Sequence, residues 1–69
     1  MIELLKALEQ KYLAAIAEGE ANVGVYLSNP AGIGEHSDIM EAIQAELDKM
    51  AMHEDRLAIL YNWPEGEEE

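Results

Sequence analysis

The side chains in this sequence that could do chemistry are two histidines and a large number of acids, and the chain has no cysteine. Without cysteine there is no thiol nucleophile, no disulfide and no cysteine-based zinc site. His36 and His53 lack the four-residue spacing with which one helix presents two histidines to a metal. Fifteen acids among 69 residues are too common for any pair of them to indicate acid–base catalysis. We therefore expect no enzyme, no metal site and no cofactor.

The one stretch that resembles a ligand loop is SNPAGIGEHSDIMEAI, residues 28–43. A glycine loop that leads into a helix can bind an anion through backbone N–H groups. This stretch, however, lacks the third glycine and the Lys-Ser/Thr pair of nucleotide loops. The same residues suit a chain-reversing turn followed by a helix cap. Both interpretations stay open, and the candidate ligand-binding residues are Gly32, Ile33, Gly34, Glu35, His36 and Ser37.

Two helices must position these residues. The spacing of apolar side chains predicts a helix over residues 2–27, although the end of it, around residues 21–28, would also suit an extended strand. Asn29-Pro30 and two glycines predict a turn over 28–36. A second helix is expected over 37–62, with Ser37 as a suitable N-cap, and it ends before Pro64.

Each predicted helix has one apolar stripe that would be buried against the other helix. In the first helix the stripe is Leu5, Leu8, Tyr12, Ile16, Val23 and Leu27, with Gly19 in the gap. In the second it is Ile39, Ile43, Leu47, Met50, Leu57, Leu60 and Tyr61. We expect His53 to border this stripe, and Glu46 with Lys49 to lie on the solvated side.

The predicted fold is all-α: an antiparallel two-helix hairpin over residues 1–63, with an acidic disordered tail at 64–69. Two helices cover only one face of each other, yet 49% of the residues are hydrophobic. We therefore expect a homo-oligomer, most simply a dimer that forms a four-helix bundle. A monomer that binds a different protein with the same surface is the alternative. The predicted interface residues are Leu4, Ala14, Ala21, Val25, Ala45, Met52 and Ile59.

The net charge is −11, and removing the four tail glutamates still leaves −7. Such a charge repels phosphate backbones, so direct nucleic-acid binding is not expected. An acidic surface could instead mimic a nucleic acid in the basic groove of another protein. We expect no membrane segment, because no uncharged apolar run approaches the roughly 20 residues that a span needs.

The segment VYLSNPAGIGEHSDIMEAIQAELDKMAMHEDRLAIL resembles a family of short uncharacterised proteins from tailed bacteriophages, which join two helices by an N-P-x-G-I-G-E-H stretch. The resemblance covers about residues 12–61, and its most specific part is Asn29 to His36. Family members often have proline after the histidine, where this chain has Ser37. The resemblance implies a phage protein that acts in the cytoplasm of an infected bacterium or in the virion. It implies no activity, so no catalytic residue is transferred.

Together these observations predict a small acidic phage protein that acts by protein–protein binding, as an inhibitor of a host protein or as a virion or assembly accessory. One alternative is an oligomeric sponge that sequesters a nucleotide-type immune signal, with residues 32–37 lining a pocket between subunits. The other alternative is the nucleic-acid mimic.

Overall fold

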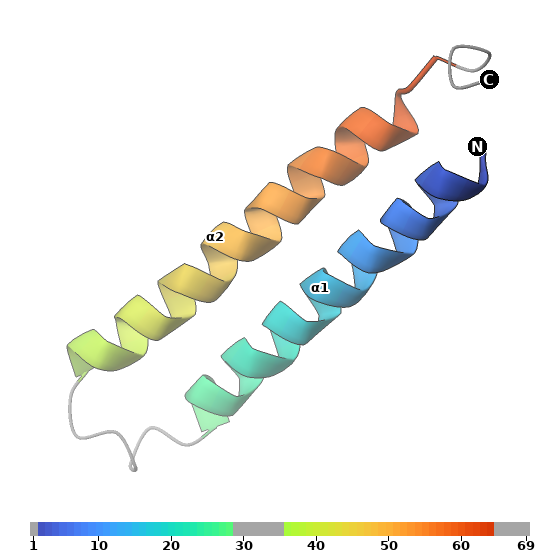
Figure 1. Cartoon of the computed structure of the whole chain (residues 1–69). Helices are drawn as coiled ribbons and strands as arrows, with labels where there is room; N and C mark the ends of the chain where they lie inside the picture. Colours follow the sequence, from blue (N-terminus) through green and yellow to red (C-terminus); the bar gives the residue numbers. More distant parts are fainter. Residues whose placement is uncertain (1, 29–35, 65–69) are drawn as a thin grey trace.

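The computed structural model describes residues 2–28 and 36–64 and shows two antiparallel helices packed side by side (Figure 1). Helix α1 spans Glu3–Ser28 and helix α2 spans His36–Tyr61. The start of α1 and the end of α2 lie at the same end of the hairpin (Figure 1). The predicted all-α hairpin is confirmed, and the segment that could have been a strand is helical up to Ser28.

Local hydrogen bonds and a proline account for the end of α2. At the end of α2, the backbone N–H groups of Asn62 and Trp63 donate to Ala58, Ile59 and Leu60, and Pro64 follows. The Asn62 side chain also donates to the Ala58 carbonyl at 2.8 Å, in addition to the Asn62 backbone N–H. Helix α2 begins one residue earlier than predicted, so Ser37 lies inside its first turn and not at its N-cap.

The seam between the helices follows spacings that alternate between three and four residues, as in an antiparallel coiled coil. On α1 the seam consists of Ile2, Leu5, Glu9, Tyr12, Ile16, Gly19, Val23 and Tyr26, all at least half-buried. On α2 it consists of Ile39, Ile43, Glu46, Met50, His53, Leu57 and Leu60. Most of the predicted stripe residues are therefore confirmed.

Four predicted stripe residues are exposed instead: Leu8, Leu27, Leu47 and Tyr61. The reason is geometric, because each of them lies one position beside the seam, where a single neighbouring helix cannot cover it. The places in the seam that the prediction missed are occupied by Glu9, Tyr26, Glu46 and His53. Sequence reading preferred the apolar neighbour, whereas helix geometry selected the polar residue.

The molecule is elongated, with principal extents of 53 × 15 × 11 Å and a radius of gyration of 16.1 Å. A compact domain of this length would have a radius of gyration of about 11 Å. Among the described residues, Leu57 and Leu60 are the only large hydrophobic side chains that are buried, at 5% and 8% exposure, and none is completely buried. The hairpin therefore has a thin seam and no thick core.

Candidate functional site

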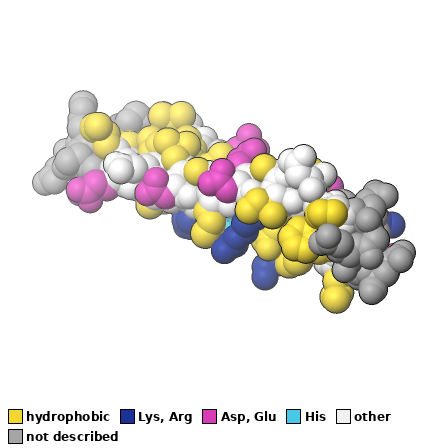
Figure 2. Space-filling view, turned by 90° about the horizontal axis from the view of Figure 1, so that it is seen from above, with side chains coloured by type: hydrophobic (Ala, Val, Ile, Leu, Met, Phe, Trp, Pro, Cys, Tyr) yellow, Lys and Arg dark blue, Asp and Glu magenta, His cyan; other side chains and the backbone are white. Residues whose placement is uncertain are grey.

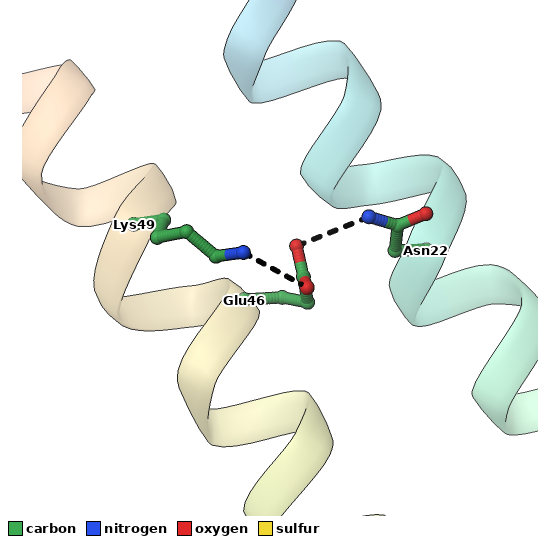
Figure 3. Close-up of polar contacts among 3 residues, drawn as sticks. All are labelled: Asn22, Glu46 and Lys49. Carbon is green, nitrogen blue, oxygen red and sulfur yellow. Dashed lines mark hydrogen bonds and ion pairs between the residues drawn. The ribbon is translucent and has the colours of Figure 1, made fainter.

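The middle of the seam holds a carboxylate where an apolar residue was predicted. Glu46 is only 8% exposed, and Asn22 Nδ2 donates to its Oε1 at 3.2 Å. On the other side, Lys49 Nζ lies 3.2 Å from Glu46 Oε2 (Figure 3). The amide of Asn22 lowers the pKa of the Glu46 carboxyl, and Lys49 adds to this, while burial acts in the opposite direction. The prediction that Glu46 points to solvent is wrong.

Gly19 provides the space for this arrangement. A Cβ added at Gly19 would lie 2.6 Å from Met50 Cγ and 2.8 Å from Met50 Sδ. It would also lie 3.8 Å from Glu46 Oε1, so the missing side chain faces both residues. The glycine thus allows α2 to approach α1 closely at this level of the seam.

Nearer the ends of the chain, the ring of Tyr12 in α1 lies against two side chains from α2. The rings of Tyr12 and His53 stack with centroids 5.5 Å apart and an interplanar angle of 29°. Arg56 Cζ also lies 5.5 Å from the centroid of the Tyr12 ring, which is within cation–π distance. His53 lies within the seam and not only at its border as predicted, and its Nδ1 is buried with no hydrogen-bond partner among the described residues.

A shallow pocket of about 210 Å³ opens beside this group. It is lined by Leu5 and Tyr12 from α1 and by Arg56, Ile59, Leu60 and Trp63 from α2. Its walls are mostly apolar, and Arg56 is the one charged residue among these lining residues. The pocket lies toward the end of the hairpin opposite the connection, away from the predicted glycine-loop site.

The pocket belongs to one long side of the hairpin, which we call the Arg56 face. On α2 this face follows a second three-and-four-residue stripe, beside the seam. The Arg56 face comprises Leu4, Leu8, Lys11, Glu18 and Val25 of α1, Asp38, Ala45, Lys49, Met52, Arg56 and Ile59 of α2, and Trp63 just after α2. Its large apolar members are exposed, with Leu4 at 74% and Ile59 at 63%.

The opposite long side is called the Leu47 face and has a different composition. It comprises Lys6, Leu13, Glu20 and Leu27 of α1 and Met40, Leu47, Glu54 and Tyr61 of α2. The neighbouring Glu9 carboxylate raises the pKa of Tyr61, and partial burial and the negative charge of Glu54 raise it further. Leu13, Leu27, Met40 and Leu47 are all exposed on this side.

The structure places most of the predicted interface residues on one face. Leu4, Val25, Ala45, Met52 and Ile59 are exposed and share the Arg56 face. Ala14 and Ala21 are also exposed, but they lie on the outer surface of α1. The residues that the sequence singled out are thus brought together as one surface, with these two exceptions.

Most of the predicted ligand loop lies outside the described residues. Gly32, Ile33, Gly34 and Glu35 lie outside the described residues, and for His36 and Ser37 only the helical backbone is described. Within residues 2–28 and 36–64, no group of three acids or histidines could hold a metal ion. Neither α1 nor α2 is long and apolar enough to cross a membrane.

Comparison with known proteins adds no family. No protein-family model matches the chain, and neither a curated protein nor a solved structure matches it significantly.

The sequence did not identify the group of Tyr12, His53 and Arg56. A signal was present, because His53 and Arg56 are three residues apart on a helix and therefore neighbours. Which residue of α1 they meet depends on the alignment of the two helices, and that alignment is set by Glu46 and Gly19.

Proposed function

We propose that this protein acts by binding protein and not by catalysis, as a hairpin that associates with further copies of itself and with a phage or host protein. The resemblance of residues 29–36 to tailed-bacteriophage proteins supports a setting in an infected bacterium. There the protein would serve as an inhibitor of a host protein or as an accessory of the virion or its assembly.

One observation carries the proposal: far more large hydrophobic side chains are exposed than buried. Among the described residues, 11 large hydrophobic side chains are exposed, against two that are buried. Single exposed hydrophobic residues are ordinary, but here they line both long sides of a two-helix hairpin. A chain of this size gains stability when another helix covers such a surface.

Self-association suits the shape of the hairpin. Two copies that pack side by side would form a four-helix bundle, the usual way in which amphipathic hairpins bury a second apolar face. The Leu47 face offers four exposed apolar side chains for this contact and carries charges of both signs. A bundle formed there would leave the Arg56 face open to another protein.

Site-specific photo-crosslinking in an expressing bacterium tests the proposal. A photoreactive benzoylphenylalanine is placed at Leu47, at Ile59 or, as the matched control, at Asp48, which lies on the outer surface of α2. We expect discrete adducts from the first two sites, either a covalent dimer or one reproducible partner, and none from Asp48. Absence of adducts at both apolar sites, together with a monomer in sedimentation at about 100 μM, would contradict the proposal.

A further inference from the structure

The cations of this chain are distributed unevenly over its surface. The chain has only four lysines and arginines, and three of them, Lys11, Lys49 and Arg56, lie on the Arg56 face. In the view of Figure 2, Lys and Arg side chains gather next to hydrophobic ones along the lower edge of the middle of the molecule, and the visible Asp and Glu side chains lie above them. In a chain with a net charge of −11, the pocket end of this side, which carries Lys11 and Arg56, is thus locally positive.

The acids on this side lie away from the pocket. Asp38 is exposed on the Arg56 face near the connection and Glu18 near its middle, and Glu46 is buried beneath the face and shared between Asn22 and Lys49. The α2 stripe of this face, from Ala45 to Trp63, includes no acid at its three-and-four-residue positions. Within the part of the chain that the structure describes, no carboxylate lies within ion-pair distance of Arg56.

The pocket adds a place for an apolar anchor next to this charge. Its volume of about 210 Å³ is below the range of about 300–1,000 Å³ in which small-molecule sites fall. A space of that size between Tyr12, Ile59 and Trp63 suits one large apolar side chain of a partner. Arg56 borders the same pocket, so an anchor residue with an acid one helical turn away would meet both features.

We propose that the Arg56 face binds an acidic amphipathic helix of another protein, with a large apolar side chain in the pocket and carboxylates on Arg56, Lys49 and Lys11. A third helix laid along the two would bury the exposed apolar stripe, as in helix-in-groove recognition. This inference rests on the proposed protein-binding function and names the face and the chemistry of the partner.

Charge complementarity selects this occupant over two others. A second copy packed face to face would place Lys49 and Arg56 of both copies in one interface, because a two-fold contact uses the same patch twice. A nucleic acid would be repelled by the whole chain at −11, with only three cations to hold it. An acidic helix meets positive charge locally and needs only a short stretch of contact.

Two synthetic 18-residue peptides test the inference by fluorescence anisotropy. Both have leucines spaced three and four residues apart, and one has glutamates at its remaining charged positions where the other has lysines. We expect the glutamate peptide to bind at least about tenfold tighter, since opposed charges at an interface outweigh distant ones. The net charge of the protein favours the lysine peptide, so this preference can come only from the Arg56 face. Tighter binding of the lysine peptide, or no binding of either at 1 mM, would overturn the inference.

Matched variants locate the contact. Arg56→Gln and Ile59→Ser should each weaken the glutamate peptide by roughly fivefold to tenfold, whereas Lys6→Gln on the Leu47 face should leave it unchanged. If Arg56→Gln and Lys6→Gln weaken peptide binding equally, the preference comes from net charge alone and the Arg56 face is not the binding site. Circular dichroism confirms that each variant keeps its helix content.

The remaining outcomes separate the other occupants. If Ile59→Ser dissociates a dimer in sedimentation and Leu47→Ser does not, the Arg56 face is a contact between copies and the inference is wrong. Displacement of the peptide by phosphatidylserine vesicles would assign the face to a lipid surface instead. If the peptides fail but photo-crosslinks from Leu47 persist, the protein-binding function stands and only this inference is lost.

Discussion

Two levels of the seam are built on opposite principles. Toward the ends of the chain, Leu57 and Leu60 are buried at 5% and 8% exposure, beside Leu5 and Tyr12 of the same end. In the middle, the residue of α2 that is buried to the same degree is Glu46, opposite a glycine. The comparison shows that burial in this hairpin does not follow hydrophobicity alone.

The two levels serve different purposes. Apolar burial stabilises the hairpin but tolerates sliding, because one leucine packs almost as well as its neighbour one turn away. The carboxylate is buried at the alignment where Asn22 of α1 reaches it and Gly19 leaves room, whereas Lys49, on the same helix as Glu46, reaches it at any alignment. We infer that the apolar level supplies stability and the polar level fixes the alignment of the helices.

The largest effect is expected at the apolar level. Leu57→Ala truncates one of the two buried hydrophobic side chains among the described residues, and such truncations cost about 2–5 kcal/mol. Because a small hairpin has little stability in reserve, we expect most of the helical circular dichroism signal to be lost at 37 °C. Thermal and urea unfolding monitored by circular dichroism measure the change.

Ile59→Ala is the matched control for this prediction. Ile59 lies two residues away on the same helix but is 63% exposed, so its truncation should change stability by no more than about 0.5 kcal/mol. The comparison is made at a concentration where sedimentation shows monomer. Equal losses in the two variants would mean that the seam lies elsewhere.

The next largest effect is expected at the polar level, at Gly19. Gly19→Ala gains helix propensity of about 1 kcal/mol, but its methyl group would overlap Met50, and overpacking costs about 1–3 kcal/mol. We expect a net loss of stability in urea unfolding. Adding Met50→Ala should recover part of this loss, because the two residues occupy one space. Simple additivity of the two changes would contradict the proposed contact.

Much of the fold could be read from the sequence, because it depends on periodicity and turn chemistry. The 3.6-residue spacing of Leu5, Tyr12 and Ile16 and the Asn29-Pro30 break were enough to predict two helices and their pairing. The second apolar stripe, from Ala45 to Ile59, could likewise be predicted as exposed, because two helices leave it uncovered.

The candidate site could be predicted less well, since it depends on a choice between neighbouring residues. Leu47 is apolar and Glu46 is charged, so composition places Leu47 inside, yet the spacing from Ile43 to Met50 puts Glu46 in the seam. Only the combined presence of Gly19, Asn22 and Lys49 makes a buried carboxylate tolerable. That combination involves residues of both helices, which one helix read alone does not reveal.

A smaller effect, of opposite sign, is expected at Gly24. A Cβ added there meets no atom within 4 Å, so Gly24→Ala should stabilise the hairpin by about 0.5–1 kcal/mol. Measured beside Gly19→Ala by urea unfolding, this variant separates helix propensity from packing. A loss of stability in both variants would show that Gly24 has a contact of its own, for instance in an oligomer.

The smallest effect is expected from the charge of Glu46, because Lys49 is 61% exposed and solvent screens its ion pair. The folded-state pKa of Glu46 is lowered, chiefly by the Asn22 amide. The ionised carboxylate therefore adds stability that is present above the unfolded-state pKa of about 4.5 and is lost as pH falls through the folded-state pKa.

Glu46→Gln should accordingly melt below the wild type at pH 7, and the difference should close toward pH 3. General acid effects cancel in this difference, because both chains lose nearly the same net charge on acidification. Asp48→Asn, two residues away and exposed, should show no such convergence. If the difference in melting temperature persists unchanged at pH 3, the loss of stability comes from the altered fit of the side chain and not from its charge. The polar level would then fix the alignment through the fit of Gly19 to Met50 alone.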